Sequence, residues 1–197
     1  METMADWEIA NIMAELKSRR YFKKDAEKLE LSYVASIKET VHSMGGLSIM
    51  PDCTADEVEV APGNFLILPG SNTWDRESNK VILQKAREFI ERGYGVAAIC
   101  GATVALANLG LLDERKHTSN GVGFLDFMSP SYRGKNNYVA ESAVRDNNLI
   151  TAAATGSLQM AKLILEYLGV MTKEKLDAWH DYFSTGNAAS FFALMGN

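Results

Sequence analysis

Short apolar runs recur along this chain, and most of them lack the three-to-four-residue spacing of a helix face. The clearest are Phe65–Leu68 and residues 96–99, which are uninterrupted and end in small or turn-forming residues. Runs of this kind are typical of strands that are buried on both faces of a sheet. Apolar and polar residues alternate over 29–37, which predicts another strand. An Asn-rich turn at 146–148 predicts a hairpin. The expected strands cover residues 29–37, 47–49, 65–68, 96–99 and 116–120, and a hairpin of 138–144 with 149–153.

Helical spacing of apolar residues marks the stretches between these strands. We expect Asp6 to be the N-cap of the first helix, and Gly93 and Gly169 to end two later ones. The expected helices cover 7–19, 77–92, a segment directly after Cys100, a short piece within 121–135, 158–168, 173–183 and 188–195. Strands alternate with helices after residue 64, so the pattern predicts a three-layer α/β fold with a mostly parallel sheet.

Composition narrows the class of protein. The 197 residues are enough for one domain with a full core, and 47% apolar and 23% charged residues are ordinary for a soluble globular protein. The net charge of -5 argues against non-specific nucleic-acid binding. No basic-then-apolar signal pattern and no membrane-length apolar run occur. We therefore expect a cytoplasmic protein with no nucleic-acid or membrane partner.

The two cysteines and three histidines of the chain form no pattern that is typical of a disulfide framework or a metal site. Cys53 and Cys100 form no disulfide framework, which fits a reducing compartment. The histidines are scattered and offer no metal-ligand spacing with the cysteines. We expect neither a metal nor an organic cofactor.

Cys100 lies where a predicted strand turns directly into a helix, with the small residues Ala98, Gly101 and Ala102 around it. That arrangement is the nucleophile elbow, in which a tight turn exposes one reactive side chain. A position at a helix N-terminus favours the thiolate and predicts a lowered pKa. Free cysteines are also among the most buried residues, so the local pattern leaves a packed core cysteine as an equal alternative.

Five segments together resemble the ThiJ/PfpI family of the class I glutamine amidotransferase-like superfamily. Their order and spacing over roughly residues 4–169 are more specific than any one of them. The segments are 4–8 (MADWE), 66–70 (LILPG), 97–101 (AAICG), 110–113 (GLLD), and 148–152 (NLITA) with the helix after it.

The resemblance implies a flavodoxin-like sandwich that forms a homodimer or larger homo-oligomer. It also implies a reactive cysteine contacted by a carboxylate, and Glu8 occupies the matching position. Without the resemblance, Glu8 is better interpreted as an exposed first-turn glutamate. Backbone N–H groups at Gly70, Ser71 and Gly101 could form an oxyanion hole. Some members take a glutamate from a neighbouring chain, a part that Asp75 or Glu77 could fill only in principle.

Three departures from the family pattern bear on function. Protease-like members carry a histidine directly after the cysteine, where this chain has Gly101. Many members carry a second histidine at the position matched by Asn120. His117 lies three residues earlier, on the opposite face of the expected strand. We expect His117 to be a surface residue and not a catalytic one. The general base for amide hydrolysis is therefore missing from its usual places. The strand that precedes the acidic motif in related sequences is also absent, so either the native protein starts earlier or other residues fill the slot.

We expect a single domain over residues 1–197, with a core of about 4–169 and a helical extension of 170–197. Core packing is the simplest role for the aromatic residues of that extension. The alternatives are a cover over the sheet edge or the active-site mouth, and an oligomer contact.

The sequence predicts cysteine-dependent chemistry on a small carbonyl or amide substrate, of hydrolase, amidase or glyoxalase type. Cys100 would be the nucleophile and Glu8 would tune the thiol or move a proton. The alternative is a stress-response protein that uses Cys100 as an oxidisable sensor without turnover. A weaker third possibility is a degenerate member that only binds a ligand.

Overall fold

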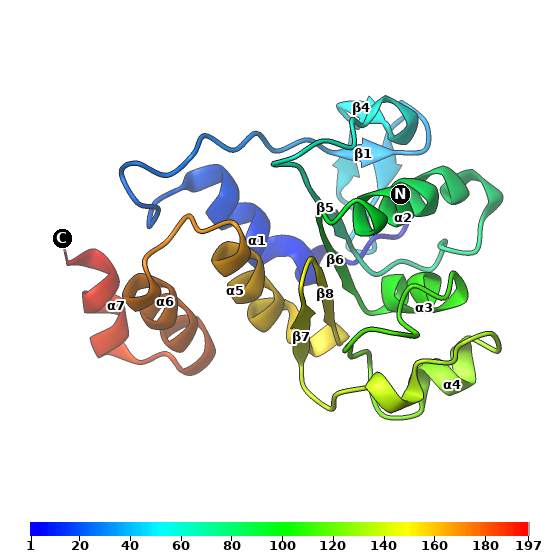
Figure 1. The fold of residues 1–197 in the computed structure, drawn as a ribbon. Helices are drawn as coiled ribbons and strands as arrows, with labels where there is room; N and C mark the ends of the chain where they lie inside the picture. The colour runs from blue at the N-terminus through cyan, green and yellow to red at the C-terminus, as the bar shows by residue number, and fades with distance from the viewer. Residues whose placement is uncertain (197) are drawn as a thin grey trace.

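The structure, a computed structural model, describes residues 1–196 (Figure 1). Its main sheet has the order β5-β6-β8-β7, formed by β5 (Phe65–Leu68), β6 (Gly95–Ile99), β8 (Leu149–Ala152) and β7 (Ala143–Asp146). The first three strands are parallel, and β7 is antiparallel to β8. The predicted strands at 65–68 and 96–99 and the hairpin are therefore confirmed, but the first strand of the hairpin covers 143–146 and not 138–144.

Helices cover both faces of this sheet (Figure 1). On one side lie α1 (Asp6–Ser18) and α5 (Ser157–Tyr167), which pack on each other. On the other side lie α2 (Lys80–Glu91) and α3 (Gly101–Asn108), both in contact with β6. The central strand β6 is buried along its whole length, as its uninterrupted apolar sequence requires. The three-layer α/β architecture is confirmed.

The N-terminal third differs most from expectation. The strand expected over 29–37 is reduced to β1 (Val34–Ala35), which pairs in parallel with β4 (Cys53–Thr54). A small hairpin joins β2 (Val41–His42) to β3 (Ser48–Ile49). The strand expected over 116–120 is wrong, because only His117 forms a bridge there, to Tyr138.

The start of α1 also corrects a prediction. Its N-cap is Ala5, with no side-chain cap, and not Asp6. The Asp6 carboxylate instead accepts a hydrogen bond of 2.6 Å from the N–H of Gly45, in the turn between β2 and β3. Asp6 therefore ties the small hairpin to the helix that carries Glu8.

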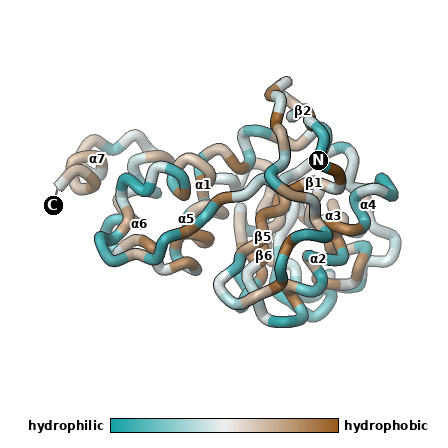
Figure 2. The backbone as a smooth tube through the Cα atoms, turned by 90° about the horizontal axis from the view of Figure 1, so that it is seen from above, coloured by the Kyte–Doolittle hydropathy of each residue, from teal (hydrophilic) through white to brown (hydrophobic). Residues whose placement is uncertain are grey.

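The shorter elements complete the chain. They are η1 (Ala55–Glu57), η2 (Glu77–Asn79), α4 (Phe124–Met128), η3 (Lys135–Asn137), η4 (Ala154–Gly156), α6 (Lys173–Thr185) and α7 (Ala188–Met195). Helix α6 packs on α5, and α7 packs on α6, so this extension projects from the sandwich (Figures 1 and 2). Within residues 1–196, no helix combines the length and apolarity needed to cross a bilayer.

The aromatic residues of the extension divide between core and surface. Trp179 is fully buried, and its indole N–H donates a 3.0 Å hydrogen bond to the buried carboxylate of Glu15, which also pairs with Arg20. Phe192 on α7 is 71% exposed. Core packing therefore accounts for Trp179 but not for Phe192. The last residue of the predicted extension, Asn197, lies outside the described residues.

Candidate functional site

Cys100 occupies the turn between β6 and α3 in a backbone conformation that L-residues rarely adopt. Its φ is 55° and its ψ is -120°. Such a conformation costs about 1–3 kcal/mol and persists only where the surroundings enforce it. The N–H of Cys100 donates to the carbonyl of Ala152 at 3.0 Å, and its own carbonyl accepts from the Thr103 hydroxyl at 2.6 Å. The elbow geometry expected from the sequence is present, with the side chain half-buried.

Two glycines allow the elbow and its neighbouring loop to approach each other. A Cβ on Gly101 would lie 3.1 Å from the carbonyl oxygen of Ser71. A Cβ on Gly70 would lie 2.5 Å from a carboxylate oxygen of Glu8 and 3.0 Å from the Cβ of Cys100. Neither glycine has a positive φ, so the requirement at both positions is space and not backbone conformation.

Glu8, near the start of α1, is brought to Cys100 from far away in the sequence. Its side chain is 1% exposed, which excludes the alternative of a solvated first-turn glutamate. Its Oε2 accepts a hydrogen bond of 2.6 Å from the N–H of Gly70, and the carbonyl of Gly70 accepts one of 2.9 Å from Ala5. Burial raises the pKa of the Glu8 carboxyl, against opposing hydrogen bonds from Gly70 and Cys100. Glu8 is therefore a carboxyl that holds a proton more firmly than usual.

Asn120 provides the other contact to the sulfur. Its side-chain NH₂ donates to the Sγ of Cys100 at 3.3 Å. Its Oδ1 accepts from the N–H of Ala154 at 2.8 Å, and this second bond fixes which end of the amide faces the sulfur. The sequence marked Asn120 only as the place of an absent histidine. The match to a histidine position was itself a signal for a site residue, because a position that carries one hydrogen-bond donor in related proteins can carry a different donor here.

The electrostatics of the thiol differ from the prediction of a lowered pKa. Burial raises the pKa of the Cys100 thiol, and the charge of Glu8 raises it as well. Hydrogen bonds from Asn120 and from the N–H of Gly101 act in the lowering direction but are outweighed. The helix N-terminus is not sufficient to lower the thiol pKa here. The sulfur faces a carboxyl, and no basic side chain within residues 1–196 bonds to it.

The backbone N–H groups proposed for an oxyanion hole do not all point to one place. The N–H of Gly70 is used by Glu8, and that of Gly101 faces the sulfur. Over residues 1–196, the N–H of Ser71 has no acceptor, and its nitrogen lies 3.6 Å from where a Cβ on Gly101 would be. The side-chain hydroxyl of Ser71 is occupied, since it donates to the carbonyl of Glu2 at 2.7 Å. Among these three residues, only Ser71 therefore has an N–H that is free to meet a substrate oxygen.

His117 is not the surface residue that was expected. Its side chain is fully buried. The Nδ1 lies 2.7 Å from the carbonyl of Arg115 and therefore donates to it, so Nε2 accepts from the Tyr132 hydroxyl at 2.6 Å. Burial lowers the pKa of His117 and raises the pKa of Tyr132 to about 12. His117 is a structural imidazole and takes no part in the site.

Within residues 1–196, neither Glu77 nor Asp75 forms a hydrogen bond to the sulfur. Glu77 is exposed and pairs with Lys80 at 2.7 Å, and Asp75 is exposed on the same loop. In the described part of the chain, no group of three or more His, Cys, Asp or Glu side chains could hold a metal ion.

Comparisons with known proteins identify related sequences and structures. The family model described as the DJ-1/PfpI family matches residues 1–167. YoaZ of Bacillus subtilis (strain 168), named an uncharacterized protease, is 42% identical over 193 residues, which are 98% of this chain and 92% of that protein. PfpI of Pyrococcus furiosus, named a deglycase, is 30% identical over 128 residues, which are 64% of this chain and 75% of that protein. The crystal structure of a thiJ/pfpI family protein from Bacillus anthracis superposes with a TM-score of 0.96 at 42% identity, covering 99% of this chain and 92% of that one.

Proposed function

The chain belongs to the DJ-1/PfpI family, and we propose that it is a cytoplasmic enzyme that uses Cys100 to attack small carbonyl compounds, in glyoxalase-type chemistry. One observation carries the proposal. The sulfur at the strained elbow lies between the Glu8 carboxyl and the amide of Asn120, with the free N–H of Ser71 nearby. A carbonyl substrate needs a nucleophile, a proton carrier and an oxygen-binding donor, and these residues provide all three.

The addition step follows from this arrangement. The Cys100 thiol gives its proton to Glu8, which starts the step as the carboxylate, as the sulfur attacks the aldehyde carbon of an α-oxoaldehyde. An S–C bond forms, and the π electrons of the C=O bond move to the oxygen, which the N–H of Ser71 holds. Glu8 then returns the proton to that oxygen, leaving a neutral hemithioacetal. The raised pKa of Glu8 suits it to accept the thiol proton and then release it.

The missing imidazole limits the chemistry open to the site after the addition. Amide hydrolysis requires protonation of an amine leaving group, for which cysteine proteases use histidine. His117 is buried away from the sulfur and bonded at both nitrogens, so it cannot act. Aldehyde substrates, which carry no amine to expel, fit this site better than peptides.

Methylglyoxal is the direct probe of the proposal. The wild-type protein should consume it, and Cys100→Ala should abolish the activity. Glu8→Gln should lower kcat more than it changes KM, because the amide that replaces the carboxyl cannot carry the proton. Cys53→Ser is the matched control and should retain full activity, since Cys53 lies in β4 and not at the elbow. Equal turnover by wild type and Cys100→Ala would refute the proposal.

A redox sensor is the second candidate, favoured by the hydrogen-bond donors around the sulfur. Asn120 and the N–H of Gly101 could hold the oxygens of an oxidised sulfur. One peroxide converts the thiol to a sulfenic acid and water, and a second converts that to a sulfinic acid and water. Mass spectrometry after peroxide treatment should then find two added oxygens on Cys100 and none on Cys53. Selective oxidation of Cys100 without any methylglyoxal turnover would favour the redox sensor over the enzyme.

We also propose that the protein is a homodimer or larger homo-oligomer. Exposed apolar side chains in the segment after Asn120 support this, since Val122 is 78% exposed and Phe127, on α4, is 84% exposed. Sedimentation velocity at micromolar concentrations should show a species larger than a monomer. Phe127→Lys should weaken the association, and a monomer at all concentrations would contradict it.

A further inference from the structure

Two buried hydroxyl groups lie beside the elbow, and the proposed chemistry does not use them. They belong to Thr103, in the first turn of α3, and to Ser119, which directly precedes Asn120 along the chain. Thr103 is 0% exposed and Ser119 is 2% exposed. Because a buried hydroxyl group is costly unless it forms a hydrogen bond, the partners of these two groups indicate what the groups do.

The distances fix the direction of the hydrogen bonds. The hydroxyl oxygen of Thr103 lies 2.6 Å from the carbonyl oxygen of Cys100 and 2.6 Å from the hydroxyl oxygen of Ser119. A carbonyl oxygen only accepts, so the single hydroxyl proton of Thr103 is donated to Cys100. The Thr103 oxygen therefore accepts from Ser119, and the donors run from Ser119 through Thr103 to the elbow.

Asn120 closes these contacts into a ring, because it follows Ser119 and donates to the sulfur of Cys100 at 3.3 Å. Asn120 is itself exposed, and strand pairing in this segment is limited to the bridge at His117. Within residues 1–196, the backbone N–H groups of Ser119 and Asn120 have no acceptor. Side chains must therefore determine where the backbone that carries the Asn120 amide lies relative to the sulfur.

The other bonds of this segment lead away from the elbow. The N–H of Thr118 donates to the hydroxyl of Thr151, on β8, at 2.9 Å. The carbonyl of Ser119 accepts a longer bond of 3.3 Å from the Tyr138 hydroxyl. Apart from Asn120 itself, only Ser119 among residues 117–120 is hydrogen-bonded to α3 or to the elbow in the described part of the chain.

We propose that Ser119 and Thr103 are positioning residues, which hold the amide of Asn120 against the sulfur of Cys100. Thr103 is tied to the elbow and Ser119 to Asn120, so one bond between two hydroxyl groups sets the separation of amide and sulfur. A hydrogen bond weakens as it lengthens or bends, so breaking the hydroxyl pair weakens the donor to the sulfur. This inference rests on the proposed function in one respect, that Cys100 is the reacting residue.

The pH dependence of Cys100 alkylation by iodoacetamide, measured on the full chain, tests the proposal. Ser119→Ala should raise the pH midpoint by about 0.5 unit and slow the reaction at neutral pH about threefold, because the bond from Asn120 is weakened but not removed. Thr103→Val breaks the same hydroxyl pair from the other side and keeps the shape of the side chain, so it should act in the same direction. Thr103→Ser keeps the hydroxyl and should retain the wild-type midpoint.

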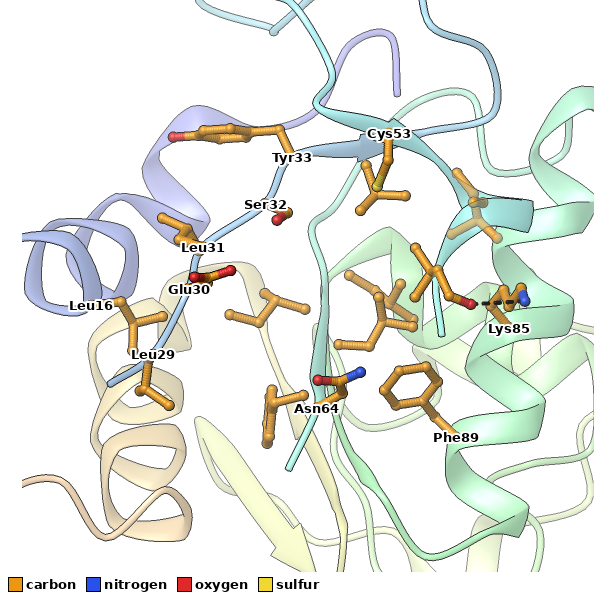
Figure 3. A pocket seen from close by; sticks show the side chains of 18 of the residues that line it. Leu16, Leu29, Glu30, Leu31, Ser32, Tyr33, Cys53, Asn64, Lys85 and Phe89 are labelled. Carbon is orange, nitrogen blue, oxygen red and sulfur yellow. Dashed lines mark hydrogen bonds between the residues drawn. The ribbon is translucent and has the colours of Figure 1, made fainter. Parts of the chain in front are cut away.

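Two controls separate positioning from a general loss of stability. Ser129 is 1% exposed, and its hydroxyl donates at 2.6 Å to Asn108, at the far end of α3. Ser129→Ala removes an equally short buried bond, so it should lower Tm about as much as Ser119→Ala and leave the Cys100 midpoint unchanged. Cys53 is the internal control, since it lines a cavity of about 670 Å³ along β5 whose walls include neither Cys100 nor Asn120 (Figure 3).

The double variant of Ser119→Ala with Asn120→Ala decides whether Ser119 acts through Asn120. If it does, Ser119→Ala should slow alkylation no further once the amide is gone. An equal slowing with and without the amide would overturn the proposal, and so would an unchanged midpoint in Ser119→Ala and Thr103→Val. A shift of the same size in Ser129→Ala would also overturn it. Alkylation requires no turnover, so a protein that fails to consume methylglyoxal would refute the proposed function and leave this test intact.

Discussion

The substitution Gly70→Ala tests how the loop after β5 holds the active-site carboxyl. The backbone of Gly70 suits any residue, because its φ is not positive. The new methyl group would nevertheless lie 2.5 and 2.9 Å from the two carboxylate oxygens of Glu8 and 3.0 Å from the Cβ of Cys100. Glu8 is 1% exposed and cannot swing into solvent. The carboxyl must shift, and its 2.6 Å bond from the Gly70 N–H must lengthen or break.

Two effects set the magnitude. Overpacking a well-packed interior by one methyl group costs about 1–3 kcal/mol. Loss of a buried hydrogen bond to a carboxyl costs about 1–3 kcal/mol more. We expect a loss of about 3 kcal/mol in the free energy of unfolding, which lowers Tm by about 6–12 °C for a domain of this size. A displaced Glu8 should also reduce kcat for methylglyoxal by about 100-fold.

Thermal unfolding and turnover measure both effects, and a double-mutant cycle isolates their cause. In the Glu8→Ala background only the 3.0 Å contact with the Cβ of Cys100 remains, so Gly70→Ala should cost less there than in the wild type. Gly196→Ala is the matched control, since the nearest atom to its new Cβ lies 3.5 Å away. If Gly70→Ala lowers Tm equally with and without the Glu8 side chain, the clash is not with Glu8 and this explanation of the loop is wrong.

Three further predictions concern the ionisation of Cys100 and of the buried His117. Alkylation of Cys100 by iodoacetamide should titrate above the pH of an ordinary thiol, and Glu8→Gln should lower that midpoint because the charge of Glu8 raises the thiol pKa; an unchanged midpoint would contradict this. Asn120→Ala should slow alkylation about fivefold at neutral pH, since a hydrogen bond worth about 1 kcal/mol to the sulfur is lost, whereas Cys53 alkylation should not change. Folding lowers the pKa of His117, so the unfolded chain binds the proton more readily than the folded chain does. The free energy of unfolding should therefore decrease as the pH falls below about 6.5, the pKa of an unfolded histidine. Denaturant unfolding of His117→Gln should therefore depend less on pH between about 7 and 5 than that of the wild type.

Local pattern was enough to predict much of the architecture. The uninterrupted apolar runs at 65–68 and 96–99 could be placed as buried strands because strands covered on both faces need no polar residues. Small residues around Cys100 identified the elbow, since only they fit where a helix packs directly on its own strand. The turn at Asn147 was predictable for the same local reason, a φ of 54° that asparagine tolerates.

The environment of the sulfur depends instead on contacts between distant parts of the chain. Glu8 and Asn120 lie 92 residues before and 20 residues after Cys100 along the chain, and no local pattern fixes their distance to it. The thiol pKa is raised and not lowered because burial and a nearby carboxyl outweigh the helix N-terminus, and burial depends on the whole fold. The segment 29–37 carries strand periodicity but is mostly unpaired, because a strand exists only where a second edge lies beside it. Local sequence therefore specifies most of the strands and helices, since their periodicity is set by neighbours along the chain, whereas long-range packing decides which side chains meet and which edges stay open.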